Sequence, residues 1–119
     1  MKTSRIALVI GALVLGVALL ALAYDGLYGG YVDPTSGDTS QVFEYHVYWS
    51  GVGEPPTAYV HIDDDWEGIM MDYDQAIGGS HGYKYSTTLP SGDHGFYFTD
   101  SMGGRDPNGE FQYVGPDVD

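Results

Sequence analysis

The chain has 119 residues, with 17 acidic side chains against four basic ones, a formal net charge of −13 and no cysteine. The lack of cysteine excludes disulfides, thiol catalysis, c-type haem attachment and iron–sulfur ligation. The acidic charge argues against a nucleic-acid partner, because a negative surface repels phosphate backbones.

An uncharged apolar run extends from Ile6 to Tyr24, after Lys2 and Arg5. As a helix, its 19 residues span roughly 28 Å, close to the hydrocarbon thickness of a bilayer. We therefore predict that residues 1–24 form a transmembrane helix, or an uncleaved signal anchor. Basic residues before the run place the N-terminus in the cytoplasm and the rest of this single-pass protein on the extracytoplasmic (periplasmic) side.

The predicted helix carries small residues four positions apart, a spacing that favours packing against other transmembrane proteins: Ala7, Gly11, Ala12 and Gly16. The tyrosines at its end are typical of an interfacial belt: Tyr24, Tyr28 and Tyr31. The alternative is a secretory leader cleaved after Ala21-Leu22-Ala23. A leader's apolar core usually has about 7–15 residues, so the length of the run favours retention.

Glycines and tyrosines over residues 25–32 predict a flexible tether, and residues 33–119 predict one all-β domain. Alternating apolar positions, as in Phe43 to Trp49, predict short strands facing a core. The expected strands are residues 42–49, 57–63, 69–73, 83–89, 94–100 and 110–116, and residues 74–82 are expected to form a loop. Short strands at this spacing without an amphipathic helix predict an antiparallel β-sandwich.

A sequence motif near the expected strand 94–100 carries a family resemblance. The stretch "LPSGDHGFYFTD" from Leu89 to Asp100 resembles the E–F corner of immunoglobulin-like sandwiches. A tyrosine often occupies the position of His94 there and bonds back to the corner backbone, which implies the same role for His94. With "PTSGDTSQVFEYHVYW", "EPPTAYVHIDD" and "YVGPDV", the chain resembles single Ig-like modules of bacterial and archaeal cell-surface proteins over residues 32–118. The resemblance implies a spacer, adhesion unit or docking platform.

Candidate metal ligands are weak. The calcium candidates are carboxylates on neighbouring loops: Asp63, Asp64, Asp65, Asp72 and Asp74. The sequence has no EF-hand loop, and a solvated acidic turn is the simpler interpretation of these residues. No histidines share a local metal-binding spacing, which leaves His46 and His61 as a cross-strand pair if their strands are neighbours. Apart from calcium, we predict no cofactor.

The sequence contains no nucleophile elbow and no P-loop, and we expect a non-enzyme. The aromatic residues are more informative, since eleven tyrosines, two tryptophans and four phenylalanines exceed what a small domain easily buries. We expect a protein interface or a carbohydrate-binding face among exposed tyrosines, with the candidates Tyr48, Tyr59, Tyr73 and Tyr97.

These observations favour an accessory or structural subunit of a larger membrane assembly, with an acidic Ig-like domain outside the cytoplasm. From Asp25 onward the chain has 17 acidic side chains against Lys84 and Arg105, a net side-chain charge of −15, which suits a basic soluble protein as partner. The alternative is a secreted or surface-displayed Ig-like module for adhesion, self-assembly or carbohydrate binding, with calcium as a candidate requirement.

Overall fold

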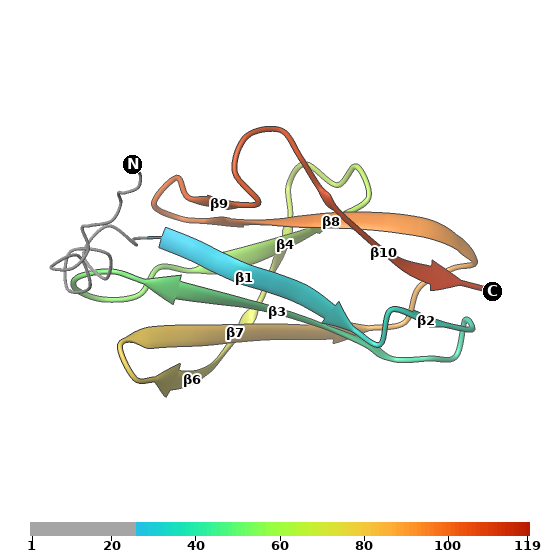
Figure 1. The fold of residues 1–119 in the computed structure, drawn as a ribbon, viewed down its shortest axis with the longest axis horizontal. Coiled ribbons are helices and arrows are strands. Elements are labelled where there is room, and N and C mark those ends of the chain that lie inside the picture. The colour runs from blue at the N-terminus through green and yellow to red at the C-terminus, as the bar shows by residue number, and fades with distance from the viewer. Residues whose placement is uncertain (1–25) are drawn as a thin grey trace, which may run out of the picture.

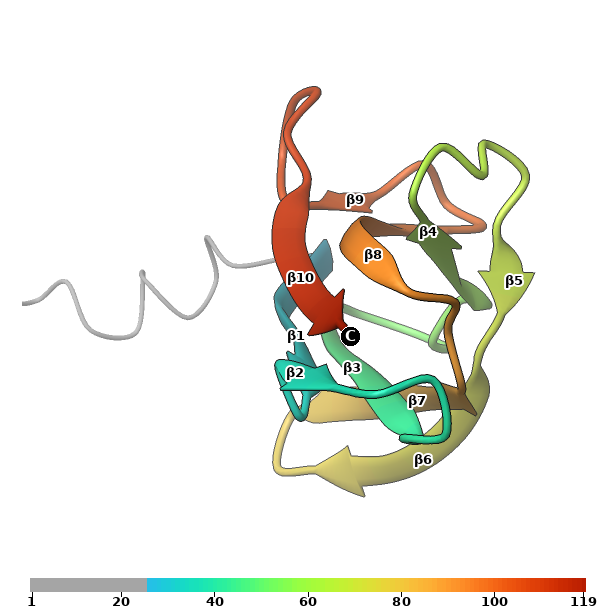
Figure 2. The ribbon, with the colours of Figure 1, turned by 90° about the vertical axis from the view of Figure 1, so that its right-hand side faces the viewer.

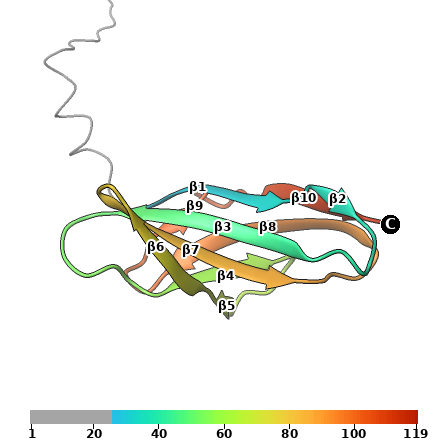
Figure 3. The same cartoon turned by 90° about the horizontal axis from the view of Figure 1, so that it is seen from below.

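The computed structural model describes residues 26–119, which form two β-sheets packed face to face (Figure 1, Figure 2). The four-stranded sheet has the order β1 (Gly26–Asp33), β3 (Phe43–Ser50), β7 (Ser80–Thr87) and β6 (Asp72–Ile77), and Figure 3 shows it from below. The six-stranded sheet has the order β2 (Ser36–Gly37), β10 (Tyr113–Val118), β8 (Gly92–Asp100), β4 (Ala58–Ile62) and β5 (Ile69–Met70), with β9 (Arg105–Asp106) paired to β8. The pairing is antiparallel except between β2 and β10. The all-β sandwich predicted from the sequence is confirmed.

The core lies between the sheets and follows the predicted alternation. The inward side chains of β3 are all buried, from Phe43 to Trp49 at every second position. From the opposite sheet, Phe96 meets Tyr45 edge-to-face with ring centroids 5.2 Å apart. Such contacts add to the burial of apolar surface that stabilises the sandwich.

His94 makes the corner bond that the motif predicts. One nitrogen of its imidazole lies 2.8 Å from the carbonyl oxygen of Pro90, at the turn into β8. The other nitrogen lies 2.8 Å from a carboxylate oxygen of Asp63, just after β4. The buried histidine therefore ties its own turn to the neighbouring strand.

The expected tether over residues 25–32 is wrong from Gly26 onward, because residues 26–33 form β1 and pair with β3. The register shifts between Tyr28 and Tyr31, where Gly29 and Gly30 lie. A Cβ atom on Gly30 would meet the Phe98 ring at 2.4 Å, so only glycine lets β1 approach the second sheet this closely. The Gly30 amide donates to the Asp106 carboxylate at 2.8 Å.

The expected loop over residues 74–82 is also wrong. Residues 72–77 form β6, which turns through Gly78 and Gly79 into β7. All six side chains of β6 are exposed, so the strand shows no alternation and is held by its backbone pairing to β7. The expected strand over 69–73 is divided between β5 and β6, with the buried Met71 between them.

The carboxylates are unevenly distributed along the sandwich. Many lie at the end opposite to Gly26, which we call the acidic end: Asp33, Asp38, Glu44, Asp63, Asp64, Asp93, Asp117 and Asp119. The C-terminus lies at this end, on the right of Figure 1.

The predicted helix over residues 1–24 lies outside the described part of the chain, as do its small residues and Tyr24. Residues 26–119 contain no helix of the length and hydropathy needed to cross a bilayer.

Candidate functional site

Aromatic and polar side chains cover the outer surface of the four-stranded sheet, where β1 and β3 lie side by side. Direct pairing of Tyr28 with Tyr48 and of Tyr31 with His46 places these four side chains on one face. The inward residues of β3 alternate with them and are buried. We call this outer surface, made of Tyr28, Tyr31, His46 and Tyr48, the tyrosine face.

The rings of the tyrosine face contact one another in two pairs. Tyr31 and His46 are stacked, with centroids 4.8 Å apart and planes inclined by 15°. Tyr28 and Tyr48 lie 5.8 Å apart in a tilted arrangement. The hydroxyl of Tyr28 also shares a hydrogen bond with that of Ser80 on β7, across the sheet. These contacts restrict the orientations of the rings.

Glycines on both neighbouring strands leave space beside Tyr48. A Cβ atom at Gly29 would lie 3.2 Å from one edge of the ring, and one at Gly82 would lie 3.5 Å from the other. A hollow of about 250 Å³ opens next to it, lined by Tyr28, Tyr48, Ile77 and Ser80. Positions 29 and 82 therefore place no side chain against the two edges of the Tyr48 ring, whereas Tyr28 lies beside it.

Hydrogen-bonding groups surround the rings. Burial, followed by a hydrogen bond to Tyr48, raises the pKa of Tyr31, whose hydroxyl carries a proton at neutral pH as an ordinary phenol does. Glu44 lies next to His46, with a carboxylate oxygen 2.8 Å from the imidazole, and accepts a weaker bond from Ser86 at 3.3 Å. The face therefore combines apolar ring surface with donors and acceptors, as polyhydroxylated ligands require.

The predicted interface tyrosines do not form one surface. Tyr48 belongs to the tyrosine face, whereas Tyr59 and Tyr97 lie on the outer side of the six-stranded sheet, opposite Met70 and His61. Tyr73 on β6 is half exposed and lines a groove of about 370 Å³ with Pro55, Pro56 and Met71 among others. The pattern of alternating residues could not indicate which sheet each strand joins.

Tyr28 and Tyr31 were expected at headgroup level on a tether, but they lie within β1. At ~3.4 Å per strand residue, Tyr31 is roughly 17 Å along the chain from Gly26. The sequence reasoning therefore missed both as members of a sheet surface. They are about twenty residues from Tyr48 in the sequence, so nothing indicates that they lie beside it until the pairing of β1 with β3 is known.

The predicted cross-strand pairing of His46 with His61 is also wrong, because the two residues lie in different sheets. His61 is buried against Tyr97, with centroids 4.3 Å apart and planes inclined by 5°. Arg105 belongs to β9, which pairs with β8. Its guanidinium carbon lies 4.1 Å from the centroid of the same Tyr97 ring. Hydrogen bonds at 2.7 and 2.8 Å engage both nitrogens of His61, with the carbonyl of Asp65 and the hydroxyl of Thr99.

Within residues 26–119, no three histidine, aspartate or glutamate side chains gather in a way that could hold a metal ion. Of the calcium candidates, Asp63 bonds to His94, and Asp74 lies 3.5 Å from the ammonium group of Lys84. Asp65 accepts a bond from the Glu67 amide. These contacts give structural roles to three of the predicted ligands.

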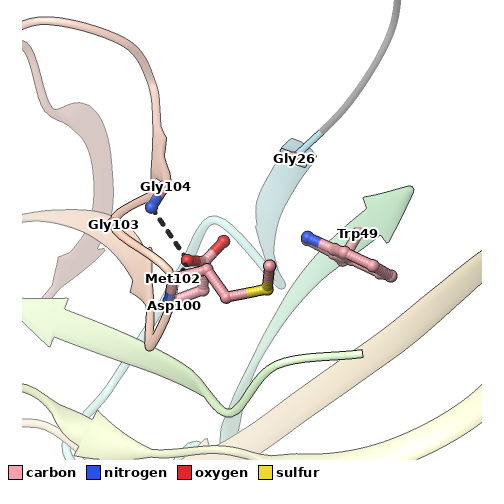
Figure 4. A pocket seen from close by; sticks show the side chains of 6 residues that line it. All are labelled: Gly26, Trp49, Asp100, Met102, Gly103 and Gly104. Atoms are coloured by element: carbon pink, nitrogen blue, oxygen red, sulfur yellow. Dashed lines mark hydrogen bonds between the residues drawn. The ribbon is translucent and has the colours of Figure 1, made fainter. Parts of the chain in front are cut away.

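A further hollow of about 260 Å³ lies at the end of the sandwich where β1 begins (Figure 4). The nitrogen edge of Trp49 faces the Met102 side chain across it. One oxygen of the buried Asp100 accepts bonds from the amides of Met102 and Gly104, both at 2.8 Å. This carboxylate therefore shapes the turn between β8 and β9.

Comparisons with known proteins support the fold. No family model matches the sequence, and no curated protein matches it. Among solved structures, the carbohydrate binding module of the muscle glycogen-targeting subunit of protein phosphatase-1, determined in solution, is similar with a TM-score of 0.55 and 13% sequence identity. The match covers 89% of this chain and 86% of that one. The chain thus has an all-β sandwich fold similar to that of a carbohydrate-binding module.

Proposed function

We propose that this chain is a non-catalytic carbohydrate-binding module whose ligand lies on the tyrosine face. The observation that carries the proposal is the set of contacting rings around Tyr48, flanked by glycines and by hydrogen-bonding groups. Sugar rings have apolar C–H faces and a rim of hydroxyls. They can stack on tyrosine rings while their hydroxyls bond to groups such as Glu44 and the tyrosine hydroxyls.

The structural neighbour supports this choice over the membrane-subunit interpretation. That protein is a carbohydrate binding module, and the likeness extends over most of both chains. A shared sandwich does not transfer a ligand, because one fold carries many functions. The proposal therefore depends on the side chains of the tyrosine face in this chain.

The charge of the chain restricts the ligand to glycans without acidic groups. Lys84, the cation among the β7 side chains, is paired with Asp74. Asp33 and Glu44 lie opposite each other at one end of the tyrosine face. Sulfated and uronic-acid polysaccharides are repelled there, whereas neutral hydroxyls can donate to these carboxylates.

Calorimetric titration of the full chain in detergent with a panel of soluble neutral polysaccharides tests the proposal. Tyr31→Ala and Tyr48→Ala should each weaken binding by ~10-fold or more, as for aromatic anchors at other interfaces. Tyr59→Ala removes a tyrosine from the outer side of the other sheet and should leave binding unchanged. Equal loss in all three variants, or no binding to any neutral glycan, would contradict the proposal.

A basic soluble protein is a second candidate partner, favoured by the acidic end of the sandwich. Its binding should weaken steeply between low and physiological salt, because exposed charges are screened. A cationic protein that binds equally well at high salt would contradict it. Asp33 and Glu44 of the acidic end also lie at one end of the tyrosine face. Competition between a basic protein and a glycan can therefore be measured on one preparation.

A further inference from the structure

Three turns gather around the start of β1, at the end of the sandwich opposite to the acidic end. Gly26 pairs with Ser50, and Ser50 pairs with Ser80 across the sheet. The turns are the β3–β4 loop, the β6–β7 turn and the β8–β9 turn, all on the left of Figure 1. Hydrogen bonds at 2.9 and 3.0 Å tie Ser101 in the last turn to Thr57. We call this region, with Gly26, the Gly26 end.

The tip of each turn exposes an apolar side chain. Val52 is 96% exposed, Met102 is 67% exposed and Ile77 is 45% exposed. A glycine follows each of the three in sequence. Large apolar side chains are exposed elsewhere as well, among them Trp66 and Phe111, so the low charge around these three is what distinguishes this end.

Charge is nearly absent from the same region. Residues 50–57, 77–80 and 100–104 contain two charged side chains, Glu54 and Asp100, and Asp25 directly precedes Gly26 in the sequence. Asp100 is buried and bonds to backbone amides of its own turn. The Gly26 end is therefore apolar at its tips within a domain that is otherwise strongly acidic.

The sequence before Gly26 indicates which kind of surface the Gly26 end contacts. The apolar run ends at Tyr24, and Asp25 is the one residue between it and β1. One residue spans at most ~3.6 Å, so no spacer separates the run from the sandwich. A run of this length and composition is suited to a bilayer.

We infer that the Gly26 end rests on the surface of a lipid bilayer, with the tips of Val52, Ile77 and Met102 in the headgroup region. The short connection holds this end at the membrane, and its low charge removes the repulsion that the acidic end would meet there. The acidic end then points away from the lipid. This inference does not depend on glycan binding, although Ile77 also lines the hollow beside Tyr48.

The lack of cysteine in the chain allows a clean test by spin labelling. The full chain is reconstituted into phosphatidylcholine vesicles as Val52→Cys, Met102→Cys and Val42→Cys variants, each carrying one nitroxide. Val42 is the matched control, an exposed valine between β2 and β3 near the acidic end. Collision rates with oxygen, which concentrates in lipid, and with a water-soluble nickel chelate report the surroundings of each label.

The inference predicts a ratio of oxygen to nickel collisions several-fold higher at positions 52 and 102 than at position 42. Exposed positions on turns tolerate the label, so misfolding is not expected, and retained β-sheet circular dichroism checks it. Equal ratios at all three positions would overturn the inference. An intact mass that begins at Tyr24 in the native protein would overturn it as well, because the run would then be absent.

Discussion

The imidazole of His94 and the carboxylate of Asp63 lie 2.8 Å apart and join the start of β8 to the residue after β4. Asp63 reaches this position with a φ of 59°, in the left-handed region. Its second carboxylate oxygen accepts the Gly95 amide at 3.1 Å, while the Asp63 amide donates to the Gly95 carbonyl at 2.7 Å. The pair therefore closes a compact bridge between two adjacent strands.

The first prediction concerns the pH dependence of this bridge. Burial disfavours the charged imidazole, but the hydrogen bonds to Asp63 and Pro90 outweigh it and raise the pKa of His94 above its ordinary value of 6.5. A raised folded-state pKa gives stability that is complete below 6.5 and is lost as the pH rises through the raised value. Urea unfolding should show this decline for the parent chain. It should be much weaker in Asp63→Asn, which keeps an acceptor but loses the charge.

The second prediction concerns the total contribution of His94. The His94→Phe substitution removes both side-chain hydrogen bonds and should lower the free energy of unfolding by about 1–2 kcal/mol at pH 6. The loss is modest because Asp63 is half-exposed, so solvent screens its charge interaction with His94. The variant should also lose the decline above pH 6.5. A full pH dependence in His94→Phe would assign the effect to another group.

The third prediction concerns the hydroxyl of Tyr45 in the core. It is fully buried and has no hydrogen-bond partner within the described residues, and burial raises the pKa of this phenol strongly. An unsatisfied buried hydroxyl is unfavourable, so Tyr45→Phe should raise the free energy of unfolding by roughly 1 kcal/mol. Chemical denaturation measures this change. Tyr83→Phe is the contrasting variant, because the Tyr83 hydroxyl donates to the Pro56 carbonyl and its removal should destabilise.

The fourth prediction separates binding from stability on the tyrosine face. A methyl group at Gly82 makes ordinary contacts of 3.5 Å with the Tyr48 ring, and alanine suits a strand better than glycine. Gly82→Ala should therefore stabilise the fold by roughly 0.5–1 kcal/mol while weakening glycan binding, because it covers one side of the ring. Unchanged binding in a stabilised variant would show that the ligand does not use this side of Tyr48.

The fifth prediction concerns the approach of β1 to the second sheet. A Cβ atom at Gly30 would lie 2.4 Å from the Phe98 ring and 2.7 Å from the Asp106 carboxylate. Gly30→Ala should thus destabilise by ~1–3 kcal/mol through overpacking. Gly79→Ala, with open space around its Cβ position, is the control and should change stability by less than about 0.5 kcal/mol.

The strands that the sequence predicted well are those that bury one face. Phe43 to Trp49 and His94 to Asp100 alternate between core and surface, so their period reports their environment. β1 and β6 were missed because neither has that period. β1 contains glycines that resemble a linker, and β6 has every side chain exposed and depends on backbone pairing.

The candidate site was predicted only in part, for a similar reason. Tyr48 was a candidate from its outward position on a strand, but its neighbours come from β1, which the sequence presented as a tether. The corner role of His94 was predicted because Pro90 is close in sequence. Its second partner, Asp63, is 31 residues away and had been a calcium candidate instead. Local motifs thus predict local bonds, whereas a surface assembled from distant strands requires the sheet order.

The uneven placement of carboxylates gives the domain an electric dipole along its strands, with the negative pole at the acidic end. Outside an anionic membrane the surface field repels that pole and exerts a torque on the domain. If the Gly26 end is fixed at the lipid, the torque keeps the long axis upright. The tyrosine face then looks sideways, in the plane of the membrane, rather than toward the lipid or directly away from it.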